Sequence, residues 1–143
     1  MQGEINFFSH KIEFVPDDIP RLKKWIAQII SANKQTLDCI NYIFCSDSYL
    51  LQLNRRHLEH DYLTDILTFP YHSPQQPALH ADIYISLDRV RDNALKFNCT
   101  PTQELHRVIV HGILHLIGYD DHSPEDKEDM RRLEDEALKL LNF

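Results

Sequence analysis

The sequence predicts an α+β fold, in which a small mixed β-sheet of about four strands is covered by helices. Its 143 residues suit one domain, spanning residues 1–143, and a 43% share of hydrophobic residues supplies a core. Short strand-like runs and segments of helical periodicity are interspersed along the chain, and the strands are few and short.

The first half of the chain is expected to contain two strands and two helices. Residues 4–10 form a short apolar run typical of a strand, and the Pro- and Asp-rich segment 15–20 is a turn. A helix should follow this turn, because apolar residues recur there at helical spacing. Residues 39–45 are rich in β-branched and aromatic side chains, which favours a strand, and residues 46–58 continue as a capped helix.

The middle of the chain is expected to return to strands and then to a helix. Residues 64–71 are typical of a strand ended by Pro70, and residues 71–79 hold two prolines without periodicity, which indicates a surface loop. Residues 81–87 alternate apolar and polar side chains and so predict a further strand. Residues 87–97 have helical character.

Two helices should complete the fold. Thr100, Pro101 and Gln103 match a capping box with proline at the first helical position, so a helix should run from there to about Ile117. Gly118 is well placed to end it. Residues 123–143 form a strongly charged terminal helix. Four of its side chains recur at helical spacing and should pack inward: Met130, Leu133, Ala137 and Leu141.

Charge and composition limit the classes of function. The net charge of −7 argues against bulk electrostatic binding of nucleic acid, although it leaves room for a local basic cleft. No segment approaches the roughly 20 apolar residues of a membrane helix, and the N-terminus lacks the layout of a signal peptide. We therefore expect a soluble, cytoplasmic protein, in which Cys39, Cys45 and Cys99 are reduced, buried thiols.

The stretch HGILHLIGYDDH, residues 111–122, contains the candidate metal ligands. His111 and His115 lie four residues apart, so both imidazoles project from one face of the predicted helix. Gly118 then turns the chain, and acceptor groups including Asp121 follow at once. The resulting zincin-like pattern, HxxxHxxGxxD, predicts one zinc ion held by two histidines and a carboxylate, with an open coordination position.

Two points in this motif have alternatives. The first alternative is that His111 and His115 are ordinary helix residues that bind no metal. In that case two unligated imidazoles would lie beside a buried apolar face. The third ligand is either Asp121 or His122, and the usual offset of six residues after His115 favours Asp121. In HExxH proteases a glutamate base follows the first histidine, whereas Gly112 stands here, so peptide hydrolysis is disfavoured.

Three segments resemble one known family. HGILHLIGYDDHSPED (111–126) resembles the signature HGxLHLxGYDH of the YbeY family. LNRRHLEHDYLTDILTFPY (53–71) is similar to that family's LNxxYRxxDxPTDVLSFP, and ADIYIS (81–86) to its GDIxIS strand. With the acidic segment that follows the signature, the resemblance extends over roughly residues 45 to 140 in the family's order.

The resemblance implies an α+β fold with one zinc ion in a cleft beside the sheet. It implies a metal-dependent endoribonuclease that acts in bacterial ribosomal RNA maturation, chiefly on the small-subunit RNA, and in ribosome quality control. The first two family ligands fall on His111 and His115. The third, normally histidine, falls on Asp121.

Candidates for substrate binding are less regular. The family arginine thought to contact RNA falls on Leu58, while Arg55 and Arg56 lie three and two residues earlier, which moves the charge to another helical face. Arg107 lies one turn before His111, where it could meet a phosphate or pair with a neighbouring acid.

No residue is identified as the general base. Asp120 and His122 flank the predicted metal and are candidates. Thr64, Asp65 and Asp82 stand at strand ends, where turn formation and a role in the site are equally compatible with the sequence.

The sequence thus supports one leading hypothesis and two alternatives. The first is a zinc-dependent endoribonuclease acting on single-stranded regions of ribosomal RNA, with the small ribosomal subunit as partner. The second is a ribosome-associated factor whose metal is mainly structural and whose catalysis is weak or absent. A metallohydrolase of another substrate, such as a peptide, is the third.

Overall fold

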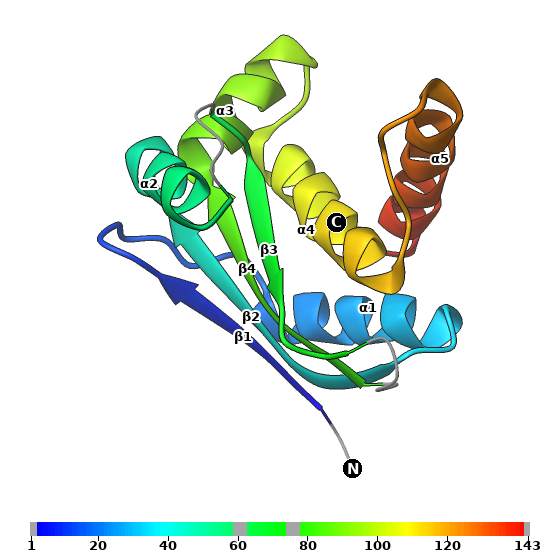
Figure 1. Cartoon of the computed structure of the whole chain (residues 1–143). Coiled ribbons are helices and arrows are strands. Elements are labelled where there is room, and N and C mark those ends of the chain that lie inside the picture. Colours follow the sequence, from blue (N-terminus) through cyan, green and yellow to red (C-terminus); the bar gives the residue numbers. More distant parts are fainter. Residues whose placement is uncertain (1–2, 59–62, 74–77, 142–143) are drawn as a thin grey trace.

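The computed structural model describes residues 3–58, 63–73 and 78–141. Within them a four-stranded sheet has the order β1-β2-β4-β3 (Figure 1). β1 pairs with β2 and β2 with β4 in parallel, whereas β3 is antiparallel to β4, so the predicted mixed sheet is confirmed. The strands are β1 (Glu4–Ser9), β2 (Thr36–Cys45), β3 (Ile66–Pro70) and β4 (Ala78–Ser86).

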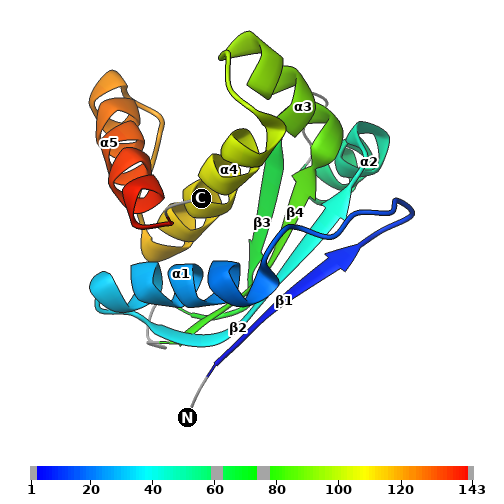
Figure 2. The same ribbon diagram turned by 180° about the vertical axis from the view of Figure 1, so that it is seen from behind.

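Helices cover the sheet unequally. α1 and α4 lie against one face of the sheet. α5 packs on these two helices from the side away from the sheet, as the front and rear views show (Figures 1 and 2). The indole nitrogen of Trp25 donates to the backbone oxygen of Ala137 over 2.8 Å and so joins α1 to α5. The helices of the described residues are α1 (Ile19–Ala32), α2 (Asp47–Leu58), α3 (Leu87–Lys96), α4 (Pro101–Ile117) and α5 (Pro124–Leu141).

The main core lies between the sheet and α1 and α4. Alternate residues of β2 point toward these helices, so Ile40, Tyr42 and Phe44 are completely buried. Ile109 and Ile113, one turn apart on α4, meet them in the same cluster. The apolar stripe on this side of α4 therefore fixes which face of the helix remains for His111 and His115.

A second, smaller cluster lies on the opposite face of the sheet. There Leu50 and Leu53 of α2 are buried with Cys45 and Leu67. This packing holds α2 beside β3 and β4 at one end of the sheet, where Asn54 and Leu58 of α2 line a groove.

Both ends of α4 form as the sequence predicts. The Thr100 side chain accepts from the backbone of Gln103, and the Gln103 side chain accepts from the backbone of Thr100, which completes the capping box. Gly118 ends the helix with φ of 123°, a conformation that favours glycine. The chain reverses there and brings Asp121 back toward the helix.

Several predicted boundaries were wrong. β2 begins at Thr36 rather than residue 39, and β4 begins at Ala78 inside the predicted loop, of which residues 74–77 lie outside the described residues. β2 and β4 are therefore long strands, because main-chain pairing between them continues past the apolar segments. Of the three free thiols, Cys45 is buried as predicted, whereas Cys39 and Cys99 are only partly buried.

No helix among the described residues is long and apolar enough to cross a membrane.

Candidate metal centre

Three predicted ligands come together at the C-terminal end of α4. The Nε2 atoms of His111 and His115 lie 2.9 Å apart. The Oδ2 atom of Asp121 lies 3.4 Å from Nε2 of His111 and 3.7 Å from Nε2 of His115. All three side chains are partly buried, and their ligand atoms can meet at one point. The helix supplies the first two and the turn after Gly118 supplies the third.

The donor set fits zinc. Tetrahedral zinc with bonds of about 2.0–2.2 Å to nitrogen and oxygen separates its ligand atoms by roughly 3.3–3.6 Å, and the three observed separations bracket that range. Two imidazoles and one carboxylate leave one tetrahedral position open. Within the described residues, this is the one group of three or more histidine, cysteine or acidic side chains whose ligand atoms lie close enough together to hold a metal ion.

A buried carboxylate that the sequence reasoning missed orients the first histidine. Glu134 of α5 lies with its Oε2 atom 2.7 Å from Nδ1 of His111, and only 8% of its side chain is exposed. A carboxylate in this position holds the proton on Nδ1 and leaves the Nε2 lone pair of His111 directed at the metal position. Glu134 lies four residues after Met130 and three before Ala137, so helical spacing alone could have predicted that it lies on the buried stripe of α5. Leu133, predicted on that stripe, is only partly buried.

Arg107 completes this network on the side away from the metal position. Its guanidinium donates to Glu134 over 2.9 Å and to Asp135 over 2.7 Å. Of the two roles considered for Arg107, the structure shows the ion pair. Because Arg107 neutralises Glu134, the buried carboxylate can accept from His111 without an isolated charge.

The pKa values of the two histidines are shifted in opposite directions. Burial acts to lower the pKa of His111, but the hydrogen bond and charge of Glu134 outweigh it, and the pKa is raised. The pKa of His115 is lowered, first by burial and second by the neighbouring His111. His115 therefore offers an unprotonated nitrogen at neutral pH, as a metal ligand must.

Two hollows flank the three ligand residues. A groove of about 540 Å³ is lined by His111, His115 and Asp121 together with residues of α2 and β3. A cleft of about 320 Å³ runs on the other side, between α4 and α5. Asp65 lines both hollows, and burial raises its pKa while the charge of His111 opposes that effect. The structure thus places Asp65, but not Asp82, near the ligands.

Asp82 instead belongs to the far face of the sheet. Its carboxylate accepts from Tyr71 over 2.8 Å and from Asn41 over 3.1 Å, so it cross-links strands and the segment after β3. Thr64, by contrast, lines the groove beside the ligands.

The remaining predicted site residues lie at the periphery. His122 and Asp120 are exposed, and the compact cluster contains Asp121 instead. Arg55 and Arg56 are exposed on α2, and neither is among the residues that line the groove. Leu58, at the end of the same helix, does line it.

Gly112 shows why a protease-type glutamate has no place after His111. A Cβ atom at this position would lie 2.8 Å from Cδ1 of Ile66 and 3.4 Å from Cγ2 of Ile83. A side chain there would therefore point into the core between α4 and the sheet, away from the ligand atoms. The glycine permits close packing of α4 on β3.

Comparison with known proteins agrees with this geometry. The profile of the family described as Endoribonuclease YbeY matches residues 5–142. A Cytophaga hutchinsonii protein named Endoribonuclease YbeY is 45% identical over 139 residues, which cover 97% of this chain and 96% of that protein. A Flavobacterium psychrophilum protein of the same name is 42% identical over 94% of this chain and 95% of its own length.

A solved structure supports the same conclusion. The solution structure of TM1509 from Thermotoga maritima has a TM-score of 0.63 and 28% sequence identity, and it covers 95% of this chain and 90% of its own. The family match spans nearly all the residues that build the sheet, the capped helix and the ligand cluster. This chain belongs to the YbeY endoribonuclease family.

Proposed function

We propose that this protein is a zinc-dependent endoribonuclease that cuts single-stranded regions of ribosomal RNA. It would act in the cytoplasm, in maturation of the small-subunit RNA and in ribosome quality control. The observation that carries the proposal is the cluster of His111, His115 and Asp121, which is open to a groove and a cleft. Family membership supports RNA as the substrate.

Each residue of the centre has a role that follows from its contacts. His111, His115 and Asp121 would hold one zinc ion, and Glu134 fixes the orientation and tautomer of His111. Bound zinc supplies Lewis-acid chemistry beside the scissile phosphate, where negative charge develops. The groove admits a single strand, whose flexible backbone can bring one phosphate to the ligand residues.

Binding of RNA to an acidic protein requires cations close to the site. Arg107, Lys127 and Arg131 line the cleft beside the ligand residues, and Arg107 is already engaged by Glu134 and Asp135. Lys127 and Arg131 are therefore better placed to contact phosphate, while contacts from Arg55 and Arg56 stay a prediction. The general base also stays open. Asp65 joins Asp120 and His122 as a candidate because it lines both hollows.

The test combines metal content with RNA cleavage in wild type and in His115→Ala, Asp121→Ala and His122→Ala. Wild type should hold about one equivalent of zinc and cut single-stranded ribosomal RNA ends. His115→Ala and Asp121→Ala should lose both properties, because each removes a ligand, whereas His122→Ala should retain them. Loss in His122→Ala with retention in Asp121→Ala would move the third ligand to His122.

A second candidate is a ribosome-associated factor with a mainly structural metal. Leu58 on the wall of the groove, together with the net charge of −7, favours it, since both weaken the attraction of RNA phosphates to this side. Zinc retained by wild type without any cleavage of RNA would support this candidate over the nuclease.

A further inference from the structure

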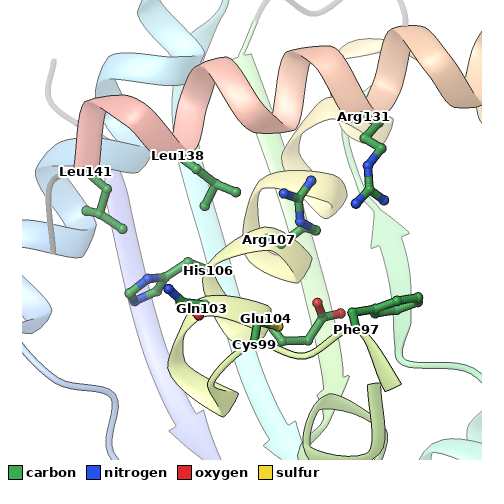
Figure 3. A pocket seen from close by; sticks show the side chains of 9 residues that line it. All are labelled: Phe97, Cys99, Gln103, Glu104, His106, Arg107, Arg131, Leu138 and Leu141. Carbon is green, nitrogen blue, oxygen red and sulfur yellow. The ribbon is translucent and has the colours of Figure 1, made fainter. Parts of the chain in front are cut away.

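We propose that a cavity between α3, α4 and α5 binds the base of an unpaired guanosine in the RNA substrate. The cavity has a volume of about 410 Å³ and is distinct from the groove at the ligand residues (Figure 3). Its walls carry an aromatic ring, a buried carboxylate and a guanidinium, which are the groups that recognise single-stranded bases. This inference rests on the proposed function, because it names a position along the same substrate.

Glu104 is the residue that points to a ligand. It is only 5% exposed, yet its carboxylate accepts no hydrogen bond from any other described residue. Burial raises its pKa, and Asp65 adds to the effect while Arg107 opposes it. The carboxylate oxygens are not among the fully buried, unpaired side-chain atoms of the described residues, so they are open to the cavity, where a ligand can donate hydrogen bonds to them.

The chemistry of Glu104 selects among the four bases. Guanine presents adjacent N1–H and N2–H donors on its Watson–Crick edge, and these match the two oxygens of a carboxylate. Adenine and cytosine each present an amino donor beside an acceptor nitrogen, and uracil presents one N–H between two carbonyl oxygens. An ionised carboxylate can therefore accept two hydrogen bonds from guanine only.

Phe97 and Arg131 complete the subsite. The Phe97 ring is 58% exposed directly after α3, which leaves a face available for stacking on a base. Figure 3 shows the side chains of Glu104 and Arg131 extending toward this ring from α4 and α5. Arg131 takes part in none of the ion pairs found among the described residues, so its guanidinium can meet a phosphate.

The cavity is connected to the metal centre. Glu104, Arg107 and Arg131 line both the cavity and the neighbouring cleft, and that cleft also contacts His111 and Asp121. Glu104 precedes His111 by seven residues, which corresponds to about 10.5 Å along a helix. One or two nucleotides can bridge that distance, so the bound guanosine would set where the strand is cut.

The single tryptophan provides a direct measurement. Trp25 contacts His106 edge-to-face with ring centroids 5.9 Å apart, and His106 lines the cavity. The fluorescence of the full-length, zinc-loaded protein is titrated with GMP, AMP, CMP and UMP. GMP should bind about tenfold or more tightly than AMP, because adenine offers Glu104 one donor beside an acceptor nitrogen, where guanine offers two adjacent donors.

Variants assign that binding to the cavity. Glu104→Gln should reduce the preference for GMP over AMP about tenfold, whereas the exposed Glu128→Gln on α5 should not change it. Phe97→Ala should weaken the binding of both purines about tenfold, whereas Leu95→Ala, at an 80% exposed position on α3, should not. Equal binding of the four nucleotides, or a preference that survives Glu104→Gln, overturns the proposal.

His115→Ala separates this proposal from the proposed function. That variant should lose cleavage and keep its preference for GMP, because His115 does not line the cavity. A wild type that cuts RNA but binds all four nucleotides alike removes the guanosine subsite and leaves the nuclease. Preferential GMP binding by a wild type that cuts no RNA removes the nuclease and leaves the subsite.

Discussion

At the scale of single residues, Glu134 determines how His111 presents its ligand atom. The carboxylate contacts Nδ1 of His111 on one side and the guanidinium of Arg107 on the other. It is far from the motif in sequence and would be missed by any search for ligand spacing. Its contribution is orientation and charge, so it should be visible in metal affinity even though Glu134 does not itself reach the metal position.

Glu134→Gln should weaken zinc binding by about tenfold to hundredfold, because an amide holds the Nδ1 proton of His111 less strongly than a carboxylate. Competition with a chromophoric chelator measures the change. Glu136→Gln is the matched control, since Glu136 is exposed on the same helix and carries the same charge. Equal zinc affinity in the two variants would show that Glu134 only supports packing.

A second residue-scale prediction concerns pH and His106. Burial lowers the pKa of His106, with Arg21 contributing and Asp17 opposing. Below a pH of about 6.5 the unfolded chain therefore takes up the proton before the folded protein does, so stability is lost as the pH falls through that range. Urea unfolding at pH 7.5 and 5.5 should show a larger loss for wild type than for His106→Gln. Equal losses would mean that His106 makes no contribution to the acid sensitivity.

At the scale of elements, α4 carries the site because both of its ends are defined locally. The capping box at Thr100 starts it, Gly118 stops it, and an apolar stripe packs it on the sheet. Gly112 allows the helix to approach β3 closely, so the two histidines are presented at the edge of the sheet rather than above it. A shift in either end would move the ligands relative to Asp121.

Thr100→Ala should lower the free energy of unfolding by about 1 kcal/mol, because the backbone N–H of Gln103 loses its acceptor. Urea denaturation followed by circular dichroism measures it. Thr102→Ala is the control, because Thr102 is exposed on the first turn and lies outside the capping box. Two variants of equal stability would mean that tertiary packing alone positions the start of α4.

At the scale of the whole molecule, the centre joins side chains from separate elements of the chain. His111 and His115 belong to α4, Asp121 to the turn after it, and Glu134 to α5. α5 lies outside the layer formed by α1 and α4, away from the sheet (Figure 2). A bound ion would therefore fix the turn that carries Asp121 and add to the packing that already holds α5 against the core.

Zinc should consequently raise the unfolding temperature of the whole protein. Binding to the folded state alone adds about 2.7 kcal/mol when free zinc reaches a hundred times its dissociation constant. Differential scanning calorimetry with zinc and with a chelator gives the shift, and His115→Ala should show almost none. An equal shift in His115→Ala would place the stabilising zinc at another site.

Much of the fold could be predicted from the sequence because the residues that start and end its helices act locally. The capping box, the proline and the terminal glycine of α4 act within a few residues, so the helix formed as predicted. Strand ends were less predictable, since the pairing of β2 with β4 across the sheet decides where each strand begins. That pairing joins residues about forty positions apart, which no local pattern records.

For the candidate centre, the sequence by itself determined the spacing of His111 and His115, because helical periodicity places them on one face. It also favoured Asp121 over His122 through the usual ligand offset, and the structure gathers Asp121 into the cluster. Only the tertiary structure decided that Glu134 contacts His111, because that contact depends on how α5 packs on α4. The position of Glu104 in the wall of the cavity arises in the same way, since its burial depends on how the helices pack rather than on local sequence.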